Sequence, residues 1–190
     1  MKKVVLIAVL ASSALMLQGC VAAVLGVGAG ATAKVVTDPR TAGTQVDDTT
    51  LNTRMNNKLS ENGPFFIGSR ISSSTYNGNI ILTGQANAEQ IEKAERLAYD
   101  VVGVKKVYNQ IRTGEPVGAG TIANDMWITT KVKSQLTLNS KTKARNIKVV
   151  TENGEVFLIG IVNSEEGQEA ASLASKVAGV RKVVTLFTQR

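Results

Sequence analysis

The fold of this chain is decided by a segment that occurs twice, as TYNGNIILTG at 75–84 and as VTENGEVFLIG at 150–160. In both copies a Gly-Val pair begins nineteen residues after the last glycine, at Gly103-Val104 and at Gly179-Val180. A period of about 76 residues suits a small duplicated domain and is too long for one solenoid repeat. Residues shared by the copies are therefore expected to specify the fold, and residues found in one copy are candidates for function.

The centre of each segment predicts a β-hairpin. Asn77-Gly78 and Asn153-Gly154 each stand between two short runs of β-forming residues. An Asn-Gly pair readily adopts the two positive φ angles that a type I′ turn requires, so a tight turn is expected in both copies.

A helix is expected before each hairpin and another after it. Asp47-Asp48 and Asn124-Asp125 are expected to cap the first helix, and Asn87 and Asn163 to begin the second with a capping box. Apolar residues at i, i+4 and i+8 form one stripe of the first helix, and alanines form the inner face of the second. The stripes are Leu51, Met55, Leu59 and Ile128, Val132, Leu136; the alanines are Ala94, Ala98, Ala170, Ala171 and Ala174.

The remaining shared positions complete the fold prediction. Gly84 and Gly160 are expected where the hairpin leads into the second helix, at places where a side chain would clash. A last strand is expected over Val104–Ile111 in the first copy and over Val180–Phe187 in the second. The expected order is αββαβ in each copy, an α+β fold with helices on one face of a small mixed sheet.

The start of the chain predicts a lipoprotein signal peptide at 1–19. Two lysines precede an apolar stretch that is short for a bilayer span, and the stretch ends in Leu17-Gln18-Gly19-Cys20. This string resembles a bacterial lipobox, which implies cleavage before Cys20 and acylation of that cysteine. Cys20 is the only cysteine, so it has no disulfide partner within the chain. A plain secretory signal that ends near a free thiol is the alternative.

Acylation at Cys20 implies a permanent anchor, because several acyl chains hold a protein far more firmly than one. Among lipoproteins of this type an aspartate after the cysteine usually means retention in the inner membrane. Val21 at this position instead implies the outer membrane, with the protein facing the periplasm. The glycine- and alanine-rich residues that follow favour a flexible tether over 20–47.

Composition argues against several classes of function. The chain has no histidine and one cysteine, so the common zinc, haem and iron–sulfur ligand sets are absent, as are Ser-His-Asp and Cys-His catalysis. We expect no metal, no cofactor and no enzyme activity. The net charge is +7, and +5 after loss of the two signal-peptide lysines. In the periplasm such a basic balance favours anionic phospholipid and lipopolysaccharide as partners over nucleic acid.

The shared residues resemble the BON domain. The resemblance rests on the αββαβ order, on the hairpins that end in Leu82-Thr83-Gly84 and Leu158-Ile159-Gly160, and on the turns Val102-Gly103-Val104 and Ala178-Gly179-Val180.

This resemblance implies a first BON domain at 48–113, a linker at 114–123 and a second BON domain at 124–190. The lipobox, the tandem copies and the run NDMWITTKV at 124–132 are similar to dual-BON lipoproteins of the outer membrane. The similarity implies binding of anionic phospholipid, such as phosphatidylglycerol or cardiolipin, through the first helix of the second domain. It also implies support of envelope integrity and enrichment at the division site.

The differences between the copies point to the same helix. At about 100° per residue, Trp127 lies roughly 140° and Met126 roughly 120° from the centre of the expected core face. The first copy has Thr50 and Thr49 at these positions, and Trp127 is the only tryptophan. An indole settles at the head-group level of a membrane, and basic residues nearby would attract anionic lipid. The expected lipid-contacting residues are Gly120, Ile122, Met126, Trp127, Thr130, Lys131, Lys133 and Ser134.

Other interpretations remain open. Trp127 can instead pack against the other domain or the linker, or be exposed without a role, and a basic run is usually only a solvated surface. Phe65-Phe66 is a second apolar pair, suited equally to an interdomain contact or to a separate site. The leading hypothesis is a phospholipid-binding module. The alternative is an adaptor for an envelope assembly protein, and an enzyme acting through carboxylates is the weakest.

Overall fold

The computed structural model describes residues 42–190, which belong to one compact unit. The expected signal peptide, the acylated Cys20 and the tether as far as residue 41 lie outside the described residues.

Each repeat consists of a helix, a hairpin, a second helix and a final strand. The first repeat comprises α4 (Ala42–Glu61), η1 (Gly63–Phe66), β1 (Arg70–Tyr76), β2 (Asn79–Ala86), α5 (Ala88–Tyr99) and β3 (Lys106–Thr113). The second comprises α6 (Ala119–Leu138), η2 (Ala144–Asn146), β4 (Ile147–Glu152), β5 (Glu155–Val162), α7 (Ser164–Ser175) and β6 (Lys182–Gln189). The expected αββαβ order and α+β class are confirmed.

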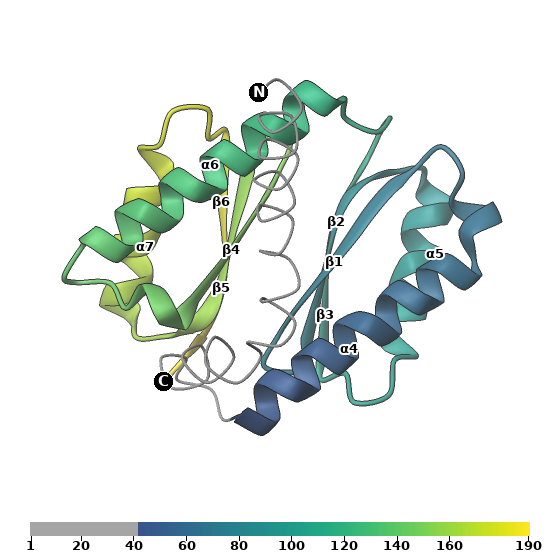
Figure 1. Ribbon diagram of the computed structural model, residues 1–190, viewed down its shortest axis with the longest axis horizontal. Helices are drawn as coiled ribbons and strands as arrows, with labels where there is room; N and C mark the ends of the chain where they lie inside the picture. The colour runs from purple at the N-terminus through teal and green to yellow at the C-terminus, as the bar shows by residue number, and fades with distance from the viewer. Residues whose placement is uncertain (1–41) are drawn as a thin grey trace, which may run out of the picture. The chain divides into compact units, whose positions relative to one another are not determined.

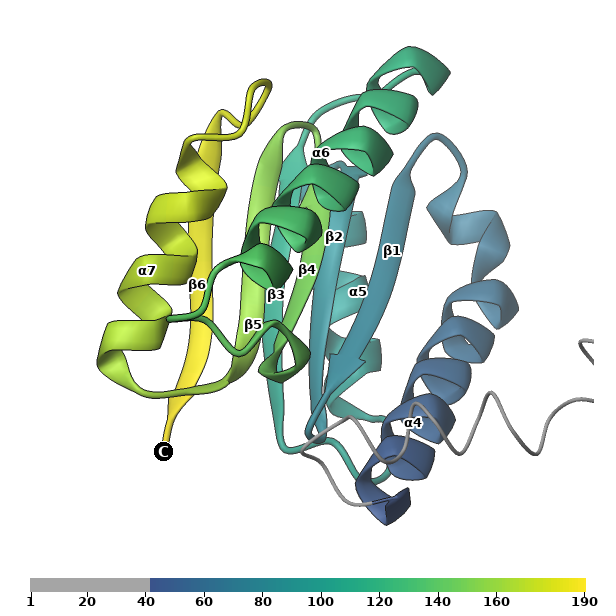
Figure 2. The same ribbon diagram turned by 60° about the vertical axis from the view of Figure 1, so that its left-hand side comes forward.

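The two sheets have the same topology. In the first, β1 pairs antiparallel with β2 and β3 pairs parallel with the other edge of β2, in the order β1-β2-β3. The second sheet repeats this order as β4-β5-β6. Figures 1 and 2 show α4 and α5 against the first sheet, and α6 and α7 against the second. The parallel pairs follow from the helix that crosses between the two strands.

The Asn-Gly turns are as expected. Asn77 and Gly78 have φ angles of 52° and 80°, and Asn153 and Gly154 have φ angles of 49° and 71°. Two successive positive φ values define the type I′ geometry that suits a two-residue hairpin.

The aspartates at 48 and 125 differ from expectation. The helices begin at Ala42 and Ala119, so Asp48 and Asp125 lie inside them and do not cap their N-termini. Asp48 is 4% and Asp125 6% exposed. Each carboxylate accepts hydrogen bonds from both backbone N–H groups of its own Asn-Gly turn, at 2.6–2.8 Å. They therefore join the first helix of each repeat to its hairpin.

Gly84 and Gly160 are required by backbone packing, as expected, but inside the strands β2 and β5. A Cβ atom at Gly84 would lie 1.8 Å from the carbonyl oxygen of Arg70, and one at Gly160 would lie 2.2 Å from that of Asn146. Gly84 also has a φ of 124°. The close neighbour is Arg70 in β1 or Asn146 directly before β4, and not the second helix.

Each sheet is covered on both faces. Its helix-facing side chains form one core per repeat, and these cores include Met55 and Leu82 in the first repeat and Val132 and Leu158 in the second. A third cluster joins the opposite faces of the two sheets through four buried residues, Tyr76, Ile81, Phe157 and Ile159. Phe66 packs against the first core, whereas Phe65 is 45% exposed. The Phe65-Phe66 pair is thus absent from the described cluster between the sheets.

Polar contacts support this sheet-to-sheet interface. Glu152 is 6% exposed and accepts hydrogen bonds from Arg70 at 2.5 Å and from Gln85 at 3.0 Å. Gln85 in turn accepts the N–H of Val117, which follows the first repeat, at 3.2 Å. The Tyr76 hydroxyl donates to the carbonyl of Asn146 at 3.1 Å. A buried carboxylate is tolerated here because cationic and amide donors surround it.

A second ion pair crosses the interface nearer to solvent. Arg112 donates through Nε and Nη2 to the two carboxylate oxygens of Glu155, at 3.0 and 2.7 Å. This hydrogen bonding lowers the pKa of Glu155 below its ordinary value, although partial burial acts in the opposite direction. The same bonds raise the pKa of Arg112.

The glycine requirement predicts that Gly160→Ala destabilises the protein. The new Cβ would force the backbone at Asn146 to move, and we expect the free energy of unfolding to fall by about 3 kcal/mol in urea titrations. Gly63→Ala is the control, because no atom lies within 4 Å of its Cβ position. A Gly160→Ala protein as stable as the wild type would contradict the packing described for β5.

The carboxylate anchor predicts a difference between two neighbouring aspartates. Asp48→Ala leaves two buried amide hydrogens without acceptors, and we expect it to lower the free energy of unfolding by about 3 kcal/mol. Asp47→Ala removes the same charge from an exposed position, and its effect is expected to stay within about 0.5 kcal/mol. Equal melting temperatures for the two variants would show that the turn does not depend on Asp48.

The Arg112–Glu155 pair predicts an acid-dependent contribution to stability. Since the pKa of Glu155 is lower in the folded state, the stabilisation is present at neutral pH and is lost as the pH falls from about 4.3 through the folded pKa. The stability difference between wild type and Arg112→Gln should therefore shrink on acidification. Arg112 is 40% exposed, so solvent screening keeps this difference small.

The matched control is Arg96→Gln, which breaks the exposed pair of Arg96 with Glu92 on α5. We expect this variant to match the wild type in stability at every pH. A stability difference for Arg112→Gln that stays constant between pH 7 and pH 3 would exclude the proposed linkage.

Candidate functional site

All residues expected to contact phospholipid lie on α6. The helix starts after Gly118, which provides no side-chain cap, and it extends into the segment expected as linker. Ile128, Val132 and Leu136 are at most 1% exposed and fix the inner face of α6. The expected core stripe of this helix is confirmed.

Trp127 and Met126 lie on the outer side of α6, as the helical spacing predicts. Trp127 is 47% and Met126 68% exposed. Their counterparts Thr50 and Thr49 on α4 are also exposed, so the same helix face is polar in the first repeat and apolar in the second. Trp127 lines a hollow of the second repeat together with Leu173 of α7 and the residues that follow that helix.

The outer surface of α6 carries three shallow hollows. Trp127 and Lys131 line one, of about 260 Å3, next to α7. Met126, Thr130 and Ile122 line another, of about 290 Å3, which includes Arg70 of the first repeat. The expected residues thus share one helix surface and do not converge on one pocket.

Three of the expected residues lie apart from these two hollows. Lys133 lines a third hollow, of about 450 Å3, together with Arg145. Gly120 and Ser134 are exposed on α6 and line none of the three.

The basic run from Lys131 to Lys148 does not form one surface. Lys148 donates to the carbonyl of Thr75 at 3.1 Å, within the interface between the repeats. Lys143 lies 3.7 Å from Glu166. Lys131 and Lys133 form no ion pair with any described residue, so their charge is available to a ligand. The Lys131 ammonium lies 5.6 Å from the centre of the Trp127 ring, at cation–π distance.

Sequence reasoning missed the contribution of α7 to this surface. Leu173, Lys176, Val177 and Ala178 line the hollow beside Trp127, about fifty residues further along the chain. Helical spacing within α6 carries no information on this contact. One signal was available, because alignment of the repeats places Lys176 opposite an acid, Asp100.

The outer side of α6 combines apolar and charged side chains. No helix within 42–190 has the length and apolar character needed to cross a membrane. The outer side of α6 instead combines an indole, a thioether and unpaired ammonium groups. Such a surface suits the boundary between water and lipid, where one side of a ligand is charged and the other is apolar.

Comparison with known proteins identifies the repeats. The profile of the BON domain matches residues 47–115 and 124–190. The chain is 43% identical over 182 residues to the outer membrane lipoprotein DolP of Haemophilus influenzae, covering 95% of this chain and 94% of that protein. It is 48% identical over 151 residues to a 21 kDa hemolysin of Actinobacillus pleuropneumoniae, covering 79% and 78% of the two chains.

A solved structure of CdsD, a structural protein of the type III secretion system of Chlamydia trachomatis, is a distant match. It has a TM-score of 0.30 and 14% identity, and the match covers 74% of this chain and 93% of that one. This likeness is too low to bear on function. The profile match and the two relatives show that the chain belongs to the BON-domain family, with two copies of the domain in tandem.

Proposed function

We propose that this protein is a lipoprotein anchored through Cys20 in the periplasmic face of the outer membrane. It binds anionic phospholipid of that face through α6. The observation that carries the proposal is the exposed pair Met126 and Trp127, at positions where the first repeat has threonines. Lys131 and Lys133, which form no ion pair within residues 42–190, add positive charge to the same helix. The lipobox and the relative named as an outer membrane lipoprotein support the location.

The proposed binding is weak and reversible. Each lysine near an anionic surface contributes about 1 kcal/mol before screening by salt. A partly inserted indole adds to this attraction at the head-group level. The protein has no catalytic role in this proposal. It supports envelope integrity, and it gathers at the division site by binding the anionic lipid there.

The single tryptophan provides a direct test. The full lipidated chain is placed in nanodiscs of phosphatidylcholine with increasing phosphatidylglycerol, and the emission of Trp127 is recorded. We expect a shift to shorter wavelength that grows with phosphatidylglycerol and is reversed by salt, since the attraction is electrostatic. Brominated phosphatidylglycerol should quench the indole several-fold more than brominated phosphatidylcholine.

The duplication supplies the matched control. The double variant Trp127→Thr, Thr50→Trp moves the indole to the equivalent position of the first repeat, and its emission should not respond to phosphatidylglycerol. Quenching that is equal for both brominated lipids, or that follows the moved indole, would refute the proposed site. A photo-crosslinker at position 127 in cells should yield lipid adducts, whereas a protein adduct would favour the adaptor hypothesis.

A further inference from the structure

The hollow beside Trp127 is built by both helices of the second repeat. The ring of Trp127 and the side chains of Lys131 and Gln135 line it from α6. Leu173 of α7 and the chain just after that helix, at Lys176, Val177 and Ala178, line it from the other side. The groove, as we call this hollow of about 260 Å3, is thus lined by apolar side chains, one glutamine and two lysines.

The two ammonium groups are uncompensated. Neither Lys131 nor Lys176 forms an ion pair with a carboxylate of residues 42–190. Other cations of the same repeat do form such pairs, as Arg190 does with Glu166 at 2.8 Å. Two unpaired cations at one groove attract an anion, and a phosphodiester has the single negative charge and the oxygen acceptors that they match.

The apolar part of the groove fits the remainder of a phospholipid. Leu173, Val177 and Ala178 line the groove together with the Trp127 ring and provide no charge. The glycerol carbons and the first methylenes of an acyl chain can occupy such a surface next to the phosphate. A free inorganic anion would use the lysines but not these apolar walls.

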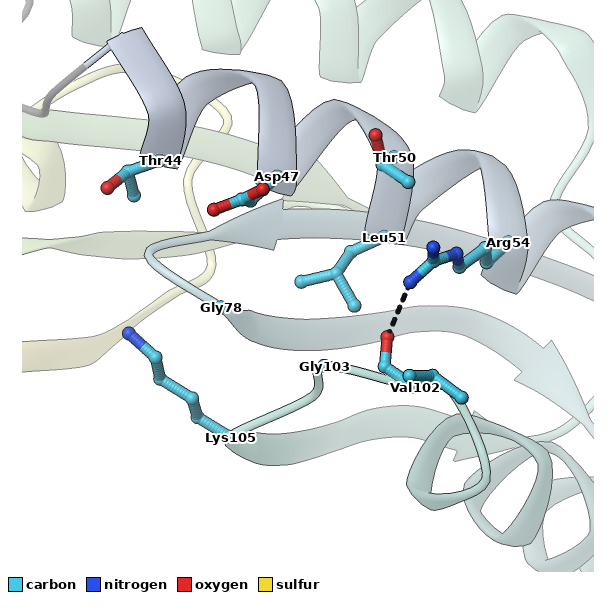
Figure 3. A pocket seen from close by; sticks show the side chains of 9 residues that line it. All are labelled: Thr44, Asp47, Thr50, Leu51, Arg54, Gly78, Val102, Gly103 and Lys105. Carbon is cyan, nitrogen blue, oxygen red and sulfur yellow. Dashed lines mark hydrogen bonds between the residues drawn. The ribbon is translucent and has the colours of Figure 1, made fainter.

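The first repeat contains a hollow that partly corresponds to the groove, since Thr50, Arg54 and Val102 line it at the positions of Trp127, Lys131 and Ala178. This hollow, of about 320 Å3, is lined by Thr50 and Asp47, where the second repeat has Trp127 and Asn124. Figure 3 shows Arg54, the counterpart of Lys131, reaching from α4 to the carbonyl of Val102, to which it donates at 2.8 Å. The lining of the first hollow therefore includes an acid, Lys105 and a guanidinium bonded to a backbone carbonyl, whereas the second hollow has an indole, two lysines and no acid.

The position that follows the second helix differs most. The C-cap residue is Asp100 after α5 and Lys176 after α7. A lysine at a helix C-terminus also offsets the helix dipole, which is a purely structural explanation for its presence. That explanation predicts an effect on folding stability, whereas a ligand-binding role predicts an effect on lipid binding.

We propose that this groove binds the phosphodiester of an anionic phospholipid between Lys131 and Lys176, with Lys176 as a lipid-binding residue outside α6. The inference rests on the proposed function and extends it from one helix surface to a groove between two helices. It assigns the preference for anionic lipid to the second repeat alone. Lys131, whose ammonium lies 5.6 Å from the centre of the indole ring, couples recognition of the phosphate to the depth of Trp127 in the bilayer.

The test uses the full lipidated chain and the Trp127 emission in the same nanodiscs. Lys176→Ala should raise the fraction of phosphatidylglycerol needed for half-maximal quenching about fivefold, as expected for the loss of one lysine at an anionic surface. Lys105→Ala, which removes an exposed lysine from the hollow of the first repeat, should raise it less than about twofold, because screening suppresses distant charges. Lys176→Arg should retain the wild-type midpoint.

The outcomes separate the groove from the proposed function. Equal midpoints for Lys176→Ala and Lys105→Ala, with selective quenching in the wild type, would overturn the groove and leave lipid binding by α6 intact. A lower melting temperature of Lys176→Ala with an unchanged midpoint would show a helix-capping role and would also overturn it. If the wild type showed no preference for phosphatidylglycerol, both the groove and the proposed function would fall.

Discussion

In each repeat, one buried carboxylate holds the first helix on the hairpin turn. Asp48 and Asp125 each accept two backbone N–H groups, and a carboxylate bound to two fixed amides permits one rotational setting of its helix. Successive side chains are about 100° apart on a helix, so the residues directly after Asp125 are turned away from the turn. The exposure of Met126 and Trp127 follows from this setting. The contact between aspartate and turn, which both repeats have, thus determines that Met126 and Trp127 of the second repeat point outward.

The pairing of the two sheets determines which surfaces remain for a ligand. Each sheet has its own helices on one face, and the four-residue cluster of Tyr76, Ile81, Phe157 and Ile159 occupies the other face. Strands that are buried on both faces have nearly continuous apolar sequences, and β5, with the sequence EVFLIGIV, is an example. The first and second helices of each repeat therefore present the outer surface. In the second repeat, that surface includes the part of α6 and the C-terminal end of α7 that form the groove.

Patterns of neighbouring residues predict the helices, strands and turns of this chain. They do not predict contacts between residues that are distant in sequence. The Asn-Gly turns and the capping boxes at Asn87 and Asn163 depend on residues at most three positions apart, and the structure confirms them. Asp48 and Asp125 were mistaken for caps because a buried aspartate that binds a turn some thirty residues away has the same local sequence as a cap. The basic run was misleading for a similar reason, since Lys148 lies on a strand that faces the first repeat.

Weak affinity is sufficient for a protein that is already tethered. Two lysines and one indole amount to only a few kcal/mol at an anionic surface, too little to hold a free protein there at low concentration. Under the proposed acylation of Cys20, the effective concentration of α6 near the head groups is set by the tether and not by the bulk. Permanent attachment then comes from the acyl chains, and the groove needs only to distinguish anionic from neutral lipid. Under the same proposal, the first repeat has no such preference, because Asp100 and Thr50 stand at the positions of Lys176 and Trp127. Under the proposal, three changed positions in a shared scaffold, Trp127, Lys131 and Lys176, account for the lipid preference of one of two equivalent domains.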